Sequence, residues 1–348
     1  MGVKISPHIH FSFDDVLIRP MRSFIEPREV SLATTIAGGF SVPTPYLSAA
    51  MDRVTDARFA IALARAGGVG VLHRNCTLAE EVHMVRVCKK AGVNVGAACG
   101  PFDAARAEAL VKAGADLLVV DCAHGHNMKV VAAARVIKKR IGKVPLVVGN
   151  IVTSEAVRDL RGVADAVKVG VGPGSICTTR LVSGVGVPQL SAIIEVAPIA
   201  HGLNMRVIAD GGMRSSSDIA KALAAGANAV MLGNLFAGAR EAPGKVIVRG
   251  GKKYKEYRGM GSRSVLRERH SSDRYFADGR KLAPEGIEGY VPCVGSVADV
   301  VGELVSGVQV AFGYVGAKDI STFQKKARFL RVTESVQYES APHSLVFS

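Results

Sequence analysis

The chain has 348 residues, 48% of them hydrophobic and 21% charged, a balance that permits a sizeable core and excludes wholesale disorder. It contains 38 glycines and no tryptophan, and it shows neither a short period nor low complexity, which excludes a collagen-like or linker sequence. The net charge is +14, but lysine and arginine are spread along the chain, which argues against nucleic acid as the main partner and fits a phosphorylated small substrate.

The N-terminal stretch MGVKISPHIHFSFDD has no apolar core of the kind that a secretory signal carries. No apolar run in the chain approaches about 18 residues, the length that a membrane span needs. The six cysteines form no C-x-x-C pair and match no zinc spacing, and the chain is too long and too poor in cysteine for a disulfide scaffold. We therefore expect a cytoplasmic protein without membrane contact.

From residue 46 onward, short apolar runs alternate with longer amphipathic stretches. The apolar runs predict strands at 46–51, 69–72, 94–99, 117–122, 145–150, 166–171, 206–212 and 229–234. The stretches between them predict helices at 56–66, 77–91, 103–113, 127–140, 154–160, 189–202 and 215–225. Near-continuous apolar strands that alternate with helices indicate a parallel sheet buried on both faces. Eight such units predict an α/β protein with a (β/α)8 TIM barrel; a doubly wound open sheet is the alternative, but no G-x-G-x-x-G fingerprint follows the first strand.

The alternation ends after the eighth strand. Residues 251–295 are charged and rich in glycine, and they predict a long mobile flap, because a structureless loop of this length in a compact domain is either functional or disordered. A helix is predicted at 296–313. The polar tail, about 330–348, is expected to lie across the surface or a neighbouring subunit. We interpret the whole chain, 1–348, as a single catalytic barrel domain.

Polar and glycine residues gather where the predicted strands end. In a barrel of this kind the active site lies at the C-terminal ends of the strands. The residues at these ends are Ser48, Met51, Asp121 to His124, Asn150, the loop 170–180, Asp210 to Gly212, Gly233 and Asn234. Their concentration at one rim predicts the active site there.

Cys177 lies in the glycine-rich loop GVGPGSICTTR, residues 170–180. Most free cysteines are small buried hydrophobic residues, and such a role would place an apolar strand around it, as at Cys99. Cys177 instead follows GPGS on a loop that can expose it, just past a predicted strand. The position suits a nucleophile with a stabilised thiolate, and a packing role stays open.

The segments ADGG (209–212) and LGN (232–234) end the seventh and eighth predicted strands. Barrels frequently bind phosphate with the loops after these strands, through backbone N–H groups that glycine brings close to the anion. Ser175 adds a hydroxyl, and the Asp210 carboxylate is suited to accept both hydroxyls of a ribose. These segments predict a nucleotide site, with tight turns as the alternative reason for the glycines.

Nearly the whole chain resembles the inosine-5'-monophosphate dehydrogenase (IMP dehydrogenase) and GMP reductase family. The matching stretches are FDDVLI (13–18), LSAAMDRVTDARFAIALARAGGVGVLHRN (47–75), GVGPGSICTTR, GVGVPQ (184–189), VIADGGMRSSSDIAKALAAGANAVMLG (207–233), EAPG (241–244), YRGMGS (257–262), SSDRYF (271–276) and PEGIEG (284–289). The cysteine loop and the ADGG segment are shared by both activities, so they identify the family and not the direction of the reaction.

The resemblance implies a mechanism. Cys177 would attack C2 of the purine of IMP, a hydride would pass from C2 to NAD⁺, and a covalent adduct would remain. Arg274, with Tyr275, would then act as the base toward water, with Thr179 helping to orient that water, and hydrolysis would release XMP. An arginine is an unusual base because its pKa is normally too high, and this role is implied by the resemblance alone.

The resemblance also implies which residues bind the ligands. The purine nucleotide would be held by Ser48, Met51, Ser175, Asp210, Gly212, Gly233, Asn234, Tyr257, Met260, Gly261 and Glu285. The dinucleotide side would be lined by Asp121, Cys122, Ala123, Asn150, Gly170 and Gly172. A K⁺ ion would be bound by the backbone carbonyls of Gly172, Gly174 and Cys177. The family analogy further suggests a homotetramer.

The sequence departs from each activity of the family in different places. Dehydrogenases mostly carry CBS modules between the second and third strands, but one helix separates Leu72 from Val95, so this insert is absent, as in GMP reductases. Cys122 and Ala123 stand where dehydrogenases commonly have two serines. In contrast, the flap contains the DRYF pair of the dehydrogenases, and Arg263 stands where GMP reductases have a glutamate. The flap therefore favours IMP dehydrogenase, with GMP reductase as the alternative.

A third hypothesis is a catalytically idle member of the family that binds nucleotides or nucleic acid through its positive charge. The presence of Cys177, Thr179, Arg274 and Tyr275 argues against it. We therefore expect an enzyme whose partner is a small purine nucleotide.

Overall fold

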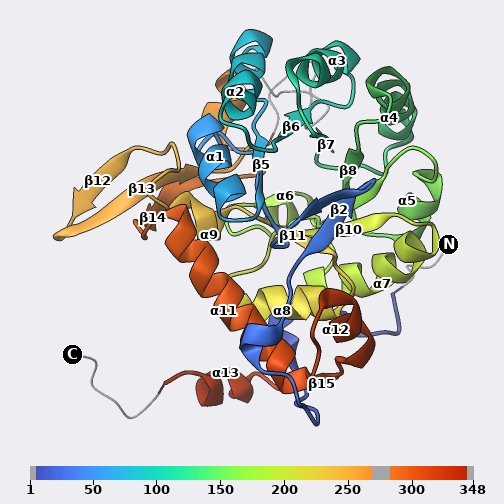
Figure 1. Ribbon diagram of the computed structural model, residues 1–348, viewed down its shortest axis with the longest axis vertical. Helices are drawn as coiled ribbons and strands as arrows, with labels where there is room; N and C mark the ends of the chain where they lie inside the picture. Colours follow the sequence, from blue (N-terminus) through green and yellow to red (C-terminus); the bar gives the residue numbers. More distant parts are fainter. Residues whose placement is uncertain (1–4, 269–282, 343–348) are drawn as a thin grey trace.

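The computed structural model describes residues 5–268 and 283–342. At the centre of this described part, eight parallel strands close into a barrel in the order β10-β11-β4-β5-β6-β7-β8-β9, with helices around it (Figure 1). The strands are β4 (Tyr46–Ser48), β5 (Val69–Leu72), β6 (Gly96–Cys99), β7 (Leu117–Asp121), β8 (Leu146–Ile151), β9 (Ala166–Val169), β10 (Arg206–Asp210) and β11 (Ala229–Leu232). Each overlaps one predicted strand, so the predicted barrel is confirmed.

The helices outside the barrel begin and end at capping residues. Thr77 opens helix α2 (Leu78–Lys90) with a capping box, in which its N–H donates to the Glu80 carboxylate at 2.8 Å and its hydroxyl accepts from the Glu80 N–H at 3.3 Å. Gly114 ends α3 at a φ of +106°, which favours glycine. Helix α2 alone joins β5 to β6. The helices that match the prediction are α1 (Ala57–Arg65), α2 (Leu78–Lys90), α3 (Ala104–Ala113), α4 (Met128–Ile141), α5 (Ser154–Asp159), α7 (Gln189–Gly202) and α8 (Ser216–Ala224).

A short hairpin, β2 (Thr34–Ala37) and β3 (Phe40–Val42), closes the N-terminal end of the barrel. The Thr34 hydroxyl donates to the carbonyl of Asn228, just before β11, at 2.9 Å. Ile36 is fully buried inside the barrel mouth. It shares an apolar cluster with the interior side chains Leu47, Val69, Val119, Val147 and Ile208. The hairpin therefore leaves the opposite, C-terminal rim as the open end of the barrel.

Helix α11 (Val297–Val315) covers the barrel on the side of α1 and α8, and it confirms the helix predicted at 296–313. Among the described residues it is the one helix whose length and composition would let it cross a membrane. Its start is capped by Ser296, and its Phe312 ring stacks on Phe323 of α12 (Ile320–Lys326) at 3.9 Å between centroids. Its buried positions, spaced as one helix face, include Val297, Val301, Leu304 and Val308.

The segment after β11 contains more regular structure than the sequence predicts. Strands β12 (Val246–Arg249), β13 (Lys252–Arg258) and β14 (Glu288–Pro292) form an antiparallel sheet, whose β12–β13 hairpin projects from the barrel in Figure 1. Helix α10 (Arg263–Glu268) follows β13. The expectation of a loop throughout 251–295 is therefore wrong for its two described ends.

The charge of β13 explains why its pattern escaped prediction. Lys255 is 4% exposed, although a lysine in a strand normally marks the solvent face. Its ammonium donates to the carbonyls of Ala239 and Ala242, both at 2.6 Å, and to that of Arg240 at 3.2 Å. These carbonyls replace water around the buried charge, so a strand with charged residues packs against the barrel.

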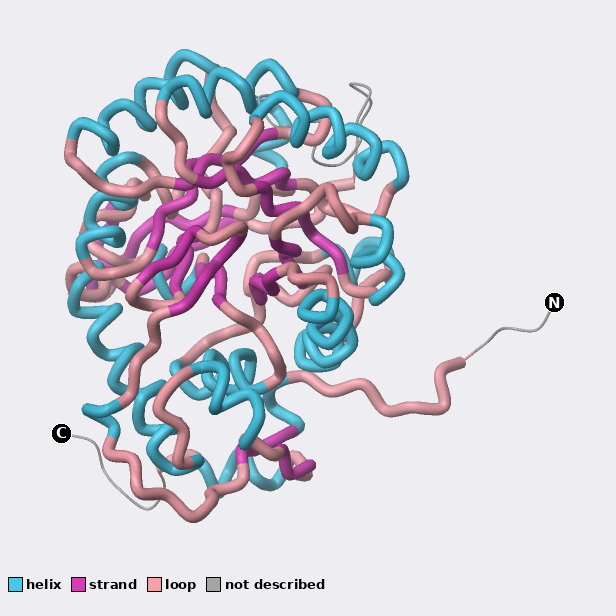
Figure 2. The backbone as a smooth tube through the Cα atoms, turned by 45° about the vertical axis from the view of Figure 1, so that its right-hand side comes forward, coloured by secondary structure: helices cyan, strands magenta, loops and turns pink. Residues whose placement is uncertain are grey.

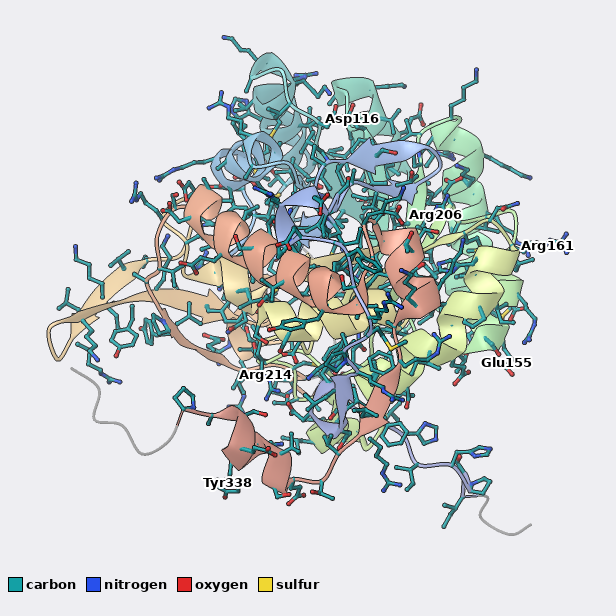
Figure 3. The ribbon with its side chains drawn as sticks, turned by 60° about the horizontal axis from the view of Figure 1, so that its bottom comes forward. Asp116, Glu155, Arg161, Arg206, Arg214 and Tyr338 are labelled. Atoms are coloured by element: carbon teal, nitrogen blue, oxygen red, sulfur yellow. The ribbon has the colours of Figure 1, made fainter. Side chains whose placement is uncertain are left out.

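Two strands from near the ends of the chain pair with each other away from the barrel. Strand β1 (Val16–Ile18) pairs antiparallel with β15 (Phe329–Arg331), and Figure 2 shows this small sheet apart from the barrel strands. Helix α13 (Ser335–Ser340) follows. Its Tyr338 is 82% exposed and points away from the body of the protein in Figure 3. The described part of the polar tail thus lies on the surface of the chain.

Candidate functional site

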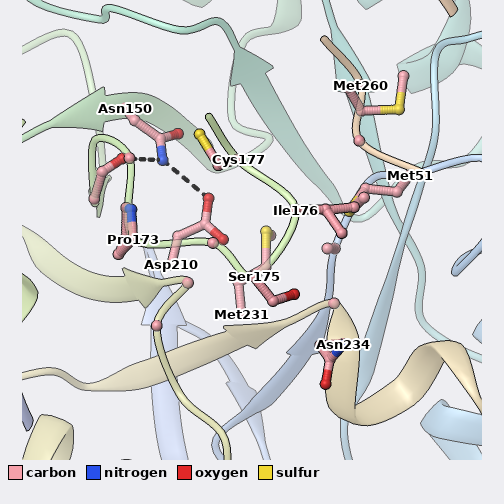
Figure 4. A pocket seen from close by; sticks show the side chains of 18 of the residues that line it. Met51, Asn150, Pro173, Ser175, Ile176, Cys177, Asp210, Met231, Asn234 and Met260 are labelled. Atoms are coloured by element: carbon pink, nitrogen blue, oxygen red, sulfur yellow. Dashed lines mark hydrogen bonds between the residues drawn. The ribbon is translucent and has the colours of Figure 1, made fainter. Parts of the chain in front are cut away.

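A cavity of about 230 Å³ opens among the C-terminal ends of the barrel strands, and Figure 4 shows part of its wall. Residues that are far apart in the sequence meet there. The wall contains these predicted site residues: Met51, Asp121, Cys122, Ala123, Asn150, Gly170, Gly172, Gly174, Ser175, Cys177, Thr179, Asp210, Gly212, Gly233, Asn234, Tyr257, Met260, Gly261 and Glu285. The fold therefore brings most of the predicted residues to one place.

Two of the residues singled out from the sequence lie elsewhere, and two more fall outside the described residues. Ser48 is fully buried behind the wall, where its hydroxyl accepts a hydrogen bond from Thr55 at 2.8 Å. Arg263 is exposed on the first turn of α10 and is not part of the wall. The predicted flap residues Arg274 and Tyr275 lie outside the described residues.

The loop that carries Cys177 is held by residues 285 and 286, in the second described part of the predicted flap. Cys177 lies between β9 and the short helix α6 (Thr179–Ser183), and it forms an antiparallel bridge with Gly286. The N–H of Thr178 donates to the carbonyl of Glu285 at 2.9 Å. Cys177 is half-buried and lines the cavity, as a nucleophile on a substrate site must.

Cys177, Thr179 and Glu285 form a line of hydrogen-bonding side chains. The Thr179 hydroxyl donates to Glu285 Oε2 at 2.7 Å, and its oxygen lies 3.2 Å from Cys177 Sγ. Because its proton points toward Glu285, the Thr179 oxygen is left to accept a proton from the thiol or from a water molecule. The line can therefore move a proton from the cavity to a carboxylate.

A buried lysine joins residues from several strands. Lys168 on β9 is 1% exposed, and its ammonium lies 2.5 Å from Asp210 Oδ2 and 3.2 Å from Asp121 Oδ1. It also donates to the Asn150 side-chain oxygen. The Asn150 amide then donates to Asp210 at 3.0 Å and to the Gly170 carbonyl at 2.6 Å (Figure 4). The ammonium compensates two carboxylates that would be costly to bury alone.

The ends of β10 and β11 form a backbone cradle. Gly211 and Gly212 have φ of +89° and +83°, the left-handed region that favours glycine. A Cβ at Gly233 would lie 2.8 Å from the Tyr257 hydroxyl, so this position requires glycine as well. Burial raises the pKa of Tyr257, which keeps its phenol protonated as a donor. Close backbone approach, a hydroxyl donor and the start of helix α9 (Asn234–Ala237) fit a phosphate group.

The side of the cavity beyond Asn150 has small side chains. The Cys122 thiol donates to the Gly149 carbonyl at 3.1 Å, so it faces the barrel backbone, and Ala123 follows it. At Gly170, a Cβ would lie 2.2 Å from the Asp210 carbonyl. Small side chains beside the Asn150 amide leave room for a flat ring with polar edges, which fits the nicotinamide end of a dinucleotide.

The predicted cation ligands lie on one turn of the cysteine loop. Gly172 has φ of +82°, and the Gly174 carbonyl accepts from the Cys177 N–H at 3.0 Å. A carbonyl oxygen has two lone pairs, so Gly174 keeps one for an ion. No group of three or more His, Cys, Asp or Glu residues within 5–268 and 283–342 is arranged to hold a metal ion. Backbone carbonyl oxygens such as that of Gly174 are the kind of ligand that K⁺ takes.

Two side chains that shape the site were missed from the sequence. Lys168 interrupts the apolar run AVKVGV. A lysine in a strand buried on both faces needs carboxylate partners, and this requirement could have identified Lys168 from the sequence. Gln189 ends the stretch GVGVPQ, whose sequence alone predicts no role for its side chain. Its amide donates to the carbonyls of Val169 at 2.8 Å and Asp210 at 3.2 Å, and so joins the ends of β9 and β10.

Known proteins match this chain over nearly its whole length. Residues 10–343 match the model of the IMP dehydrogenase / GMP reductase domain. The chain is 37% identical over 475 aligned positions to the inosine-5'-monophosphate dehydrogenase of Methanocaldococcus jannaschii, and this alignment covers 97% of this chain and 96% of that relative. It is 41% identical over 394 positions to the protein of the same name from Borreliella burgdorferi, covering 97% of each chain. The one from Cryptosporidium parvum is 39% identical over 381 positions, covering 96% of this chain and 95% of that relative.

Proposed function

The chain belongs to the IMP dehydrogenase / GMP reductase family, and on this premise we propose that it oxidises IMP to XMP with NAD⁺. The observation that carries the proposal is the line of Cys177, Thr179 and Glu285 in the wall of the cavity. A nucleophile with a built-in proton path is what attack on a purine carbon and hydrolysis of the adduct both require. The relatives compared above carry the same name as the proposed activity.

In the first half of the reaction, Cys177 gives its proton to the Thr179 oxygen as Thr179 gives its own proton to Glu285. The thiolate then attacks C2 of the purine and forms a C–S bond. NAD⁺, when bound, supplies the acceptor for the hydride that leaves C2 with its electron pair. The 3.2 Å and 2.7 Å contacts of Thr179 support this path for the proton.

In the second half, water attacks C2 and the C–S bond breaks, which releases XMP and regenerates Cys177. The Thr179 oxygen is placed to orient this water and accept its hydrogen bond, with Glu285 behind it. The resemblance adds Arg274, with Tyr275, as the base, and these residues lie outside the described part of the chain. The reaction consumes IMP, NAD⁺ and water and yields XMP, NADH and a proton.

The nucleotide would bind with its phosphate in the cradle of Gly212 and Gly233, where Ser175 and Tyr257 supply hydroxyl donors. Asp210 would accept the ribose hydroxyls. Because Lys168 and Asn150 both contact Asp210 Oδ2, its other carboxylate oxygen is left for the ribose. The purine would then lie between Cys177 and the residues Met260, Gly261 and Glu285, as the resemblance implies.

NAD⁺ would be held on the side of Asp121, Cys122, Ala123 and Asn150, next to Gly170. K⁺ would be held by the carbonyls of Gly172, Gly174 and Cys177, where it would fix the cysteine loop. We also propose that the protein is a homotetramer, as the family analogy suggests.

GMP reductase is the second candidate, because the matched family model covers both activities and helix α2 alone joins β5 to β6. Arg263, which separated the two activities in the sequence, does not line the cavity. The reductase would consume NADPH and release ammonia from GMP.

The direct test is NADH formation by the purified protein with IMP, NAD⁺ and K⁺, beside a reaction with GMP and NADPH. We expect NADH with IMP, and XMP as the product. Cys177→Ala removes the nucleophile and should abolish turnover. Cys293→Ala is the matched control, because this half-buried cysteine is not part of the cavity wall, and it should keep wild-type activity. NADPH consumption with GMP and no NADH with IMP would assign the reductase instead.

A further inference from the structure

Arg258 is a buried charged residue that the proposed mechanism does not use. It belongs to the strap, defined here as residues 257–262, which borders the cavity in the first described part of the predicted flap. Its strap neighbours Tyr257 and Met260 line the cavity, but Arg258 does not. Its side chain is 7% exposed and turned toward the barrel. A buried charge needs hydrogen-bonding or oppositely charged partners, and the partners of Arg258 indicate its role.

One edge of the Arg258 guanidinium forms hydrogen bonds with Asp52, which follows the cavity residue Met51 and is 6% exposed. Nε donates to Oδ2 at 3.0 Å and to Oδ1 at 3.3 Å, and Nη2 also donates to Oδ2. Burial by itself would raise the pKa of Asp52, but the hydrogen bonds and charge of Arg258 outweigh it and hold the pKa below its usual value. The pair is therefore ionised, and its forked geometry fixes angle as well as distance.

The other edge binds Glu268, the last residue of α10. Nη1 donates to Glu268 Oε1 at 2.9 Å and Nη2 to Oε2 at 3.0 Å. The Asn75 amide connects the two carboxylates, at 3.1 Å from Asp52 and 2.8 Å from Glu268. Glu268 is 39% exposed, so water screens this arm, whereas the Asp52 arm is shielded. The Asp52 arm is therefore the stiffer of the two.

The strap reaches two opposite walls of the cavity. On the cysteine side, backbone hydrogen bonds tie it to residues 285–287. On the other side, the Tyr257 hydroxyl lies 4.0 Å from Met51 Sδ, and the Arg258–Asp52 pair is the charged contact. The width of the cavity between the two walls thus depends on a contact that lies just behind its surface.

We propose that Arg258 is a positioning residue for the substrate nucleotide, whose fork on Asp52 sets the distance between the strap and the loop after β4. Through Tyr257 and Met260, this distance determines how closely the phosphate and purine are held. Arg258 acts without touching the nucleotide. The inference rests on the proposed function in one respect, since that function identifies the substrate nucleotide as IMP.

The test uses Arg258→Lys and Asp52→Asn in the full-length protein. Lysine keeps the charge but offers a point contact in place of a fork, so we expect the KM for IMP to rise about tenfold. The KM for NAD⁺ should stay within about twofold, because Asn150 and its neighbours lie on the other side of the cavity. An unchanged KM for IMP in Arg258→Lys would overturn the inference.

A double variant separates positioning from simple stability. Single removal of either partner leaves a buried charge unpaired and lowers the melting temperature. Asp52→Asn combined with Arg258→Gln leaves neither charge of this pair, so we expect the melting temperature to recover toward wild type while IMP affinity stays about tenfold weaker. Recovery of IMP affinity together with stability would mean a purely structural role and would overturn the inference.

Calorimetric binding of IMP and GMP keeps this inference separate from the proposed activity. Arg267→Gln, which changes an exposed arginine on α10, is the matched control and should leave IMP binding unchanged. If wild type binds IMP but makes no NADH, the proposed activity is wrong and the binding data still test Arg258. If wild type binds neither nucleotide, both proposals are wrong.

Discussion

The Lys168 ammonium lies 2.5 Å from the Asp210 carboxylate, and through this contact one buried charge connects the two proposed halves of the site. The same ammonium lies 3.2 Å from Asp121. The ammonium offsets the cost of burying the Asp210 carboxylate, which would accept the ribose hydroxyls. Lys168 therefore prepares the nucleotide side of the cavity without needing to touch the nucleotide.

We predict that Lys168→Met lowers both stability and IMP affinity. Methionine keeps the length of the side chain but leaves Asp210 and Asp121 buried without their ammonium, a loss of roughly 3–5 kcal/mol. Melting temperature and KM for IMP measure the two effects. Lys168→Arg, which keeps the charge, should recover part of both, and an unchanged melting temperature in Lys168→Met would contradict the assignment.

We predict that Thr179→Val lowers steady-state turnover by about 10²-fold, because valine has the same shape but cannot pass a proton to Glu285. Rapid mixing would follow the first turnover, where accumulation of the adduct would identify hydrolysis as the slowed step. Thr178→Val is the matched control, since the Thr178 hydroxyl does not cap α6 and its backbone contact is unaffected. Equal losses in both variants would contradict the proton path.

We predict that Gly233→Ala raises the KM for IMP by about tenfold with a smaller change in kcat. The added Cβ would lie 2.8 Å from the Tyr257 hydroxyl, and Tyr257 is buried, so the phenol has to move away from the phosphate cradle. Gly302→Ala is a control at an exposed position of α11, where no atom lies within 4 Å of the new Cβ. It should leave KM unchanged and stabilise the helix by about 0.5–1 kcal/mol.

We predict that the protein loses stability as the pH falls below about 6.5, partly through His73. Burial lowers the pKa of His73 below its usual value, and the charges of Asp52 and Asp56 offset this only in part. The folded state then binds fewer protons than the unfolded chain, so stability rises with pH in this range. His73→Gln should flatten the dependence of melting temperature on pH. His83→Gln, an exposed histidine on α2, should keep the wild-type slope.

Sequence reasoning succeeded where structure follows from local pattern. The alternation of apolar runs and amphipathic stretches predicted each barrel strand, because a strand buried on both faces must be apolar along its length. It failed for β13, where Lys255 is buried by carbonyls of a segment that precedes it in the chain. Most of the predicted rim residues line one cavity because all parallel strands of a barrel end at the same side, whereas Ser48 is buried behind the wall.

By itself, the sequence determined the barrel, the family and the identity of most residues in the cavity wall. Tertiary structure alone decided which of these residues act together. Thr179 contacts Glu285 across 106 positions, and Lys168 contacts Asp210 across 42. Periodicity reports the local conformation of neighbouring residues, whereas contacts such as these depend on closure of the barrel and the register of its strands. Lys168, Gln189 and Arg258 therefore received their roles only when the folded chain showed their partners.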